Sequence, residues 1–180
     1  ILVGPASELI PTGTRVVLVP DGCLHELNFE TLRVRAGDSH YWIQDVTIAV
    51  APSLGVLQEA GSVSTAPSKS MLLIGDAVPV SDEFPRLKSA AVEIVRIKNQ
   101  FDHPTVLTGP TANSAAYGEA HPGLFRLIHF SAHATPNRQS PLNSAVILSP
   151  QSDTYKLYAR DVMNTRLQAQ IVTISACHSA

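Results

Sequence analysis

The sequence predicts a single α/β domain built around a mostly parallel sheet. Along its 180 residues, short apolar runs that end at Pro, Gly, Asp or Thr alternate with stretches of helical periodicity. Apolar runs of this kind are typical of strands buried on both faces by helices. Six strands are predicted, at residues 15–19, 46–51, 71–74, 105–107, 124–130 and 171–174.

Three segments carry helical patterns. The first is an amphipathic stripe at helical spacing, formed by Leu87, Ala91, Ile94, Val95 and Lys98. The Lys98 stem can extend along this stripe. The second candidate is 111–120, with Thr111 as its N-cap, and the third is a short helix at 158–163.

Two other segments lack a clear period. Residues 60–70 are rich in Ser, Thr, Ala and Pro, which predicts an exposed connector rather than a linker between domains. Residues 135–154 form a long loop region that could hold a small extra strand at 145–148. The crossover 134–170 is long enough to return the last strand parallel to the one before it.

Composition narrows the function classes. The formal net charge is −2 and no basic run occurs, so no nucleic-acid partner is expected. No apolar stretch reaches the roughly 18–20 residues of a membrane-spanning helix, so no membrane partner is expected either. The two cysteines, Cys23 and Cys177, leave a disulfide open, but a reducing cytoplasm is the expected location. The start lacks both Met and a signal peptide, which is typical of a piece of a longer protein.

Two reactive side chains follow two predicted strands. His133 comes just after the strand that contains Leu-Ile-His-Phe, and Cys177 comes just after Ile-Val-Thr-Ile. In parallel sheets, sites gather at the carboxyl ends of strands, and neighbouring strands lie about 4.8 Å apart. If the two strands are neighbours, His133 and Cys177 can form a thiol–imidazole pair for nucleophilic catalysis. The alternative is a buried structural cysteine and a hydrogen-bonded structural histidine.

Residues 127–134 (LIHFSAHA) resemble the histidine motif of CHAT domains, a caspase-like family often joined to TPR repeats. Residues 174–180 (ISACHSA) resemble the cysteine motif of the same family. Four further segments match the family in order: 17–30 (VLVPDGCLHELNFE), 49–53 (AVAPS), 72–76 (LLIGD) and 106–109 (VLTG). Each motif alone is loose, but six in order are specific.

The resemblance implies a caspase-like three-layer sandwich with a mostly parallel central sheet, here lacking its C-terminal part. Residues 1–180 would be the N-terminal, large-subunit-like portion of one CHAT domain, either truncated or processed. It also implies a cysteine endopeptidase in which His133 is the general base and acid and Cys177 the nucleophile. The backbone N–H groups near Ala134 and of Cys177 would hold the oxyanion. No cofactor or metal is expected.

Further expectations concern substrate and partners. Ser175 stands where caspases line the pocket for an acidic P1 side chain, and it is too short for that role. An arginine from elsewhere, including Arg15, Arg33 or Arg35, could reverse this expectation. The expected partners are a protein substrate and a regulatory or TPR-type region of the same or an associated protein. The alternative function is a catalytically silent CHAT scaffold that binds other proteins.

A metal site is the remaining alternative for the histidines. His129 and His133 form an H-x-x-x-H pattern, which on a helix would suggest two ligands of one ion. On a strand these positions lie about 13 Å apart, so His129 is predicted to be structural. No P-loop, G-x-S-x-G or G-x-G-x-x-G motif is present.

Overall fold

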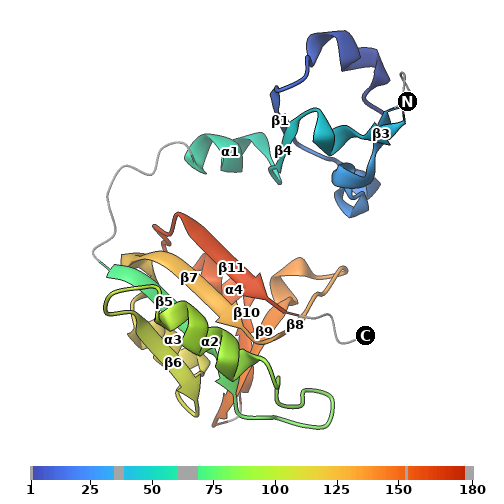
Figure 1. Cartoon of the computed structure of the whole chain (residues 1–180). Coiled ribbons are helices and arrows are strands. Elements are labelled where there is room, and N and C mark those ends of the chain that lie inside the picture. The colour runs from blue at the N-terminus through green and yellow to red at the C-terminus, as the bar shows by residue number, and fades with distance from the viewer. Residues whose placement is uncertain (1, 35–38, 61–68, 153, 177–180) are drawn as a thin grey trace. The chain divides into compact units, whose positions relative to one another are not determined.

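The computed structural model describes residues 2–34, 39–60, 69–152 and 154–176 (Figure 1). The chain divides into two compact units, Ile1–Ser64 and Thr65–Ala180. The boundary falls in the predicted connector 60–70, most of which lies outside the described residues. No helix in the described ranges is long and apolar enough to cross a membrane.

The described residues of the first unit form two small sheets and one α-helix. Strands β1 (Arg15–Leu18) and β4 (Thr47–Val50) pair in parallel, and both confirm predicted strands. Strands β2 (Arg33–Val34) and β3 (His40–Tyr41) pair antiparallel. Helix α1 spans Leu54–Ala60. Short 3-10 helices complete the unit at Gly4–Leu9, Gly22–Glu26, Phe29–Thr31 and Trp42–Gln44.

The second unit is built on a four-stranded parallel sheet in the order β11-β7-β5-β6. These strands confirm the other four predicted ones: β5 (Lys69–Ala77), β6 (Thr105–Gly109), β7 (Phe125–Ser131) and β11 (Ile171–Ser175). Strands β7 and β11 are neighbours in this sheet, which meets the condition set above for bringing His133 and Cys177 together. The chain is mixed α/β, as the sequence predicts.

A second, antiparallel sheet in the order β10-β9-β8 follows β7. Strand β9 (Ala145–Gln151) confirms and extends the extra strand expected at 145–148. The sequence did not predict β8 (His133–Thr135) or β10 (Thr154–Tyr158). Both strands are short and lack a continuous apolar run, so their sequences alone do not indicate a strand. They form because they pair with β9.

Within residues 69–152 and 154–176, the second unit has three α-helices: α2 (Ala90–Lys98), α3 (Ser114–Glu119) and α4 (Ala159–Met163). Two 3-10 helices lie at Pro122–Leu124 and Pro141–Asn143. Helix α4 confirms the short helix predicted at 158–163. Figure 1 shows α2 lying along one face of the parallel sheet.

The N-cap of α3 differs from the prediction. The Asn113 side chain accepts a hydrogen bond from the Ala116 N–H at 2.8 Å, so Asn113 is the N-cap. The Thr111 hydroxyl instead donates to the Thr108 carbonyl and accepts from the Thr108 N–H. Thr111 closes a local turn after β6, a competing use of a hydroxyl side chain.

The inward face of α2 also differs from the predicted stripe. Ala90 and Ile94 are buried, Ile94 with only 3% of its surface exposed. Val95 is 55% exposed and Lys98 is exposed, so neither faces the sheet. Glu93 takes a place on the inward side, where it hydrogen-bonds to strand side chains. Ile97 and Phe101 pack against the same cluster as Ile94, so the buried stripe follows residues 90, 94, 97 and 101.

The second unit buries apolar side chains on both faces of its parallel sheet. Alternate residues of β5 face opposite ways, so Leu73 packs with Ile94 of α2, whereas Leu72 and Ile74 join the other core. That other core includes Tyr117 of α3 and Leu148 of β9. Helix α2 therefore covers one face, and α3 with the antiparallel sheet covers the other.

Gly75 permits a close approach between β5, β7 and α2. A Cβ atom at this position would lie 2.7 Å from the Ser131 carbonyl oxygen and 3.1 Å from Cδ1 of Ile94. Both are tighter than ordinary van der Waals contact, and the nearer one is to backbone that cannot rotate away. Only glycine fits here without displacing β7 or α2.

We therefore expect Gly75→Ala to destabilise the protein by about 1–3 kcal/mol through overpacking. Gly118→Ala is the matched control, because Gly118 is helical and its added Cβ would meet nothing within 4 Å. That control should be neutral or stabilise by about 0.5–1 kcal/mol. Urea unfolding of both variants measures the difference, and an unchanged midpoint for Gly75→Ala would contradict the packing argument.

Candidate active site

The carboxyl ends of β7 and β11 meet side by side. Ser131 pairs with Ser175 in register, and the Ala132 N–H donates to the Ser175 carbonyl at 3.3 Å. His133 and Cys177 each lie two residues beyond this last pair. The predicted nucleophile Cys177 lies outside the described residues. What the structure describes is therefore the histidine and the two strand ends that lead to the pair.

His133 opens strand β8 and is half-buried. Its Nε2 lies 2.8 Å from the Pro85 carbonyl oxygen, and its ring centroid lies 5.8 Å from that of Phe84. A carbonyl oxygen only accepts hydrogen bonds, so Nε2 must carry the proton. In the neutral ring Nδ1 is then the acceptor nitrogen. A histidine held in this tautomer can take a proton through Nδ1.

The partner of His133 comes from the segment 78–89, which connects β5 to α2. Phe84 is buried beneath the ring, and Pro85 follows it with an exposed side chain. Sequence reasoning missed this contact, because a backbone carbonyl acceptor leaves no signature in residue type. A loop of fixed shape is therefore part of the site.

A separate cluster of polar side chains connects α2 to the ends of β7 and β11, and Glu93 of α2 is at its centre. One carboxylate oxygen lies 3.1 Å from Nε2 of His129, and the other accepts from the Ser131 hydroxyl at 2.6 Å. The Ser175 hydroxyl also donates to the second oxygen, at 3.4 Å. His129 and Ser131 are 7% and 3% exposed. One carboxylate thus joins α2 to both strands.

The prediction that His129 is structural agrees with these contacts. It lies on β7 as a strand residue and pairs with Glu93 rather than with His133. Among the described residues, no three His, Cys, Asp or Glu side chains are grouped so that they could hold a metal ion.

The ionisation of Glu93 reflects these partners. Partial burial would raise the pKa of its carboxyl, but hydrogen bonds from Ser131 and Ser175 and the nearby His129 outweigh burial. The pKa of Glu93 therefore lies below its usual value. Folding then favours the charged form, so Glu93 stabilises the fold above its ordinary pKa of about 4.3. That contribution is lost as the pH falls further, through the folded-state pKa.

We expect Glu93→Ala to destabilise the fold by about 2–4 kcal/mol, because His129 and Ser131 would remain buried without their acceptor. Glu93→Gln should cost less, since it keeps one carbonyl oxygen. The difference in unfolding free energy between wild type and Glu93→Gln should shrink as the pH falls below about 4. Urea unfolding from pH 7 to pH 3 measures this, with Glu119→Gln at an exposed position of α3 as the control. If the difference in unfolding free energy between wild type and Glu93→Gln did not depend on pH, the argument that Glu93 stabilises the fold as a carboxylate would be contradicted.

The other two predicted site residues lie on described strands. Ala134 pairs with Val146 across β8 and β9, and Ser175 ends β11 with its hydroxyl on Glu93. Their assignments to the oxyanion site and to the substrate pocket stay predictions.

Two cavities in the described part of the chain differ in how close they lie to the candidate active site. A small one of about 20 Å³ lies against His133 and Ser131, and Phe84, Pro85 and Val78 also line it. It has room for about one water molecule and none for a substrate side chain. A larger cavity of about 710 Å³ lies in the first unit, lined among others by Trp42 and Asp45. None of the predicted site residues that the structure describes, His133, Ala134 and Ser175, lines it.

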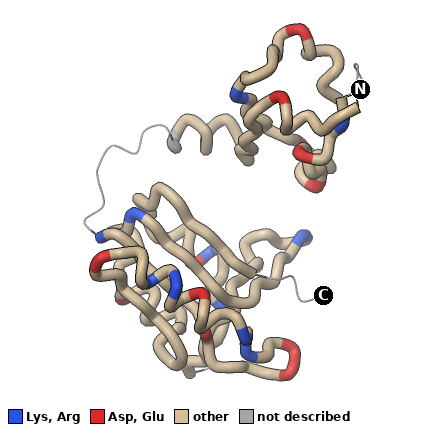
Figure 2. The backbone as a smooth tube through the Cα atoms, in the orientation of Figure 1, with Lys and Arg blue, Asp and Glu red and all other residues tan. Residues whose placement is uncertain are grey.

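Charge does not single out a ligand surface. Figure 2 shows Lys and Arg interspersed with Asp and Glu along the tube of each unit. The formal net charge of the whole chain is −2. Any site is therefore defined by specific side chains rather than by a broad field.

The family model described as the CHAT domain matches residues 1–180, the whole chain. The chain belongs to the CHAT family. CHAT domains are associated with caspase-like cysteine peptidases. A search of the curated proteins found no match. The resemblance inferred from six short motifs is thereby confirmed at the level of the family.

Proposed function

We propose that this CHAT domain is a cysteine endopeptidase that cleaves proteins through His133 and Cys177. The observation that carries the proposal is the hydrogen bond from Nε2 of His133 to the Pro85 carbonyl, at the carboxyl end of the parallel sheet. It leaves Nδ1 as the basic atom of a ring held beside the strand that leads to Cys177. We also propose that the complete domain folds as a caspase-like three-layer sandwich.

The chemistry follows from these roles. Nδ1 of His133 accepts the Cys177 thiol proton, and the thiolate attacks the substrate carbonyl carbon. Backbone N–H groups of Cys177 and near Ala134 stabilise the resulting oxyanion. The imidazolium then returns its proton to the departing amine, leaving a thioester on Cys177. His133 next takes a proton from water, whose oxygen attacks the thioester and releases the acid and the thiol.

The location and control of the activity belong to the same proposal. We place the enzyme in the cytoplasm, where its thiols stay reduced. Other regions of the parent protein, or a TPR-type partner, gate the activity. The support for this gating is the family's association with repeat regions.

We expect His133→Ala and Cys177→Ala each to lower cleavage by about 10³-fold or more in the full-length protein, without unfolding it. Cleavage of a peptide library and labelling by a thiol-reactive peptide probe measure the effect. Cys23→Ala is the control, because Cys23 is an exposed free cysteine of the first unit. Full activity in both dyad variants would refute the peptidase. Stable binding of a protein partner with no labelling of Cys177 would favour the silent scaffold.

The P1 preference is expected not to be acidic. Ser175 offers only a hydroxyl, and that hydroxyl is bonded to the Glu93 carboxylate. An acidic P1 side chain beside Ser175 would face a like charge and leave its own charge without a partner. A positional-scanning library on the full-length protein tests this, and a dominant preference for Asp or Glu at P1 would contradict it.

A further inference from the structure

Strand β5 ends in a β-bulge, and Asp76 is the extra residue of that bulge. In the pairing of β5 with β6, Gly75 lies opposite Thr108 and Ala77 lies opposite Gly109. Asp76 is thus the extra residue, and its φ of +49° is in the left-handed region. Aspartate tolerates this region better than most residues, and bulges beside sites often redirect a side chain.

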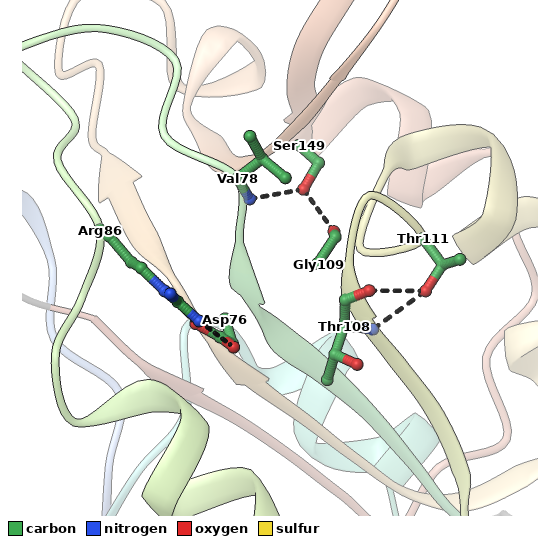
Figure 3. A network of polar contacts seen from close by, with 7 residues as sticks. All are labelled: Asp76, Val78, Arg86, Thr108, Gly109, Thr111 and Ser149. Atoms are coloured by element: carbon green, nitrogen blue, oxygen red, sulfur yellow. Dashed lines mark hydrogen bonds and ion pairs between the residues drawn. The ribbon is translucent and has the colours of Figure 1, made fainter.

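The redirected carboxylate binds one arginine through two parallel hydrogen bonds. Nε of Arg86 donates to Oδ1 of Asp76 and Nη2 donates to Oδ2, both at 2.9 Å (Figure 3). The Asp76 side chain is 14% exposed, whereas that of Arg86 is 63% exposed. The pair therefore lies at the rim of the sheet, with its anion sheltered and its cation open to solvent.

This pair fixes one end of the segment 78–89, and a buried serine fixes the other. The Val78 N–H donates to the Ser149 hydroxyl at 2.8 Å, and that hydroxyl donates to the Gly109 carbonyl at 2.6 Å (Figure 3). Ser149 is buried in β9. The segment is thus tied to β6, β9 and the end of β5.

The residue that Asp76 holds is the one next to the histidine's partner. Arg86 directly follows Pro85, whose carbonyl accepts the proton of Nε2 of His133. One peptide unit therefore separates the ion pair from the carbonyl that sets the tautomer and direction of the ring. A shift of this peptide would move the acceptor away from His133.

We propose that Asp76 and Arg86 are positioning residues that hold the Pro85 carbonyl against His133; the proposal rests on the proposed function, in which His133 is the base. Neither residue touches the reacting atoms. Their effect passes through the backbone of Pro85 to the imidazole. The pair sets which ring nitrogen carries the proton, and hence which one can accept it from a thiol.

The exposure of Arg86 makes this role separable from stability. Because the guanidinium stays open to water, the pair should contribute only modestly to the free energy of unfolding, although Asp76 is sheltered. A role in positioning therefore predicts that breaking the pair alters His133 while the fold stays nearly as stable. A role in stability alone predicts the reverse.

The test uses Asp76→Asn and Arg86→Lys in the full-length protein. Asparagine tolerates the left-handed backbone but loses the charge, and lysine keeps the charge but loses the two-pronged geometry. Asp82→Asn in the same segment and Arg96→Lys on the exposed face of α2 are the matched controls. The two controls should melt within about 2 °C of wild type, and the two pair variants within about 4 °C.

The first readout is the tautomer of His133, from ¹⁵N shifts in histidine-labelled protein, with His133→Gln used to assign the signal. Wild type and controls should show the proton on Nε2. Asp76→Asn and Arg86→Lys should show a mixture of tautomers. The same tautomer in all variants would overturn the proposal, whether or not the protein is a peptidase.

The second readout is the rate at which iodoacetamide alkylates Cys177 at pH 7. It should fall about 10-fold in Asp76→Asn and Arg86→Lys, with no further loss in the double variant, because each removes the same orientation of the base. Equal rates in wild type and His133→Ala would refute the proposed function instead. A loss that tracks a lowered melting temperature would overturn the positioning role.

Discussion

The docking of α2 through the Glu93 carboxylate is the interaction on which the rest of the site depends. His129 and Ser131 are buried on β7, and their polar atoms need an acceptor that water cannot supply there. Glu93 supplies it and also accepts from Ser175, so one helix is held against both strands that lead to the catalytic pair. Since α2 begins a few residues after Pro85, the position of the helix limits where the Pro85 carbonyl can lie.

Close packing and the polar cluster reinforce one another at this face of the sheet. Gly75 lets the Ser131 backbone and Ile94 approach β5 more closely than any side chain would allow. That approach brings α2 near enough for Glu93 to reach Ser131 at 2.6 Å. Ile94 and Glu93 are adjacent on the helix, so the apolar contact and the charged contact fix its rotation together. Ala90 and Ile97 add further apolar contact along the same side of the helix.

The sequence predicted the main strands because buried parallel strands are short apolar runs between turn residues, and all six appear near their expected bounds. It also predicted that His129 is structural, whereas the pairing of β7 with β11 was a condition for the catalytic pair that only the sheet order could settle. It misplaced the inward face of α2, because two overlapping apolar stripes share Ile94, and the buried one continues through Ile97 rather than Val95. It missed the Pro85 carbonyl and strand β8, which depend on backbone groups and long-range pairing rather than on residue type. The nucleophile itself, Cys177, rests on motif and family alone.

The two anchors of the site differ in a way that fits their separate tasks. Glu93 lies between helix and strands with buried partners, so its hydrogen bonds are strong and removing it affects the fold. Asp76 and Arg86 lie at the rim, where solvent weakens the charge but the two-pronged geometry still restricts direction. The first contact reaches the site through the packing of α2 on the strands, and the second reaches it through the backbone of Pro85. The histidine is thus supported by the docked helix and oriented by a separate contact in the preceding segment.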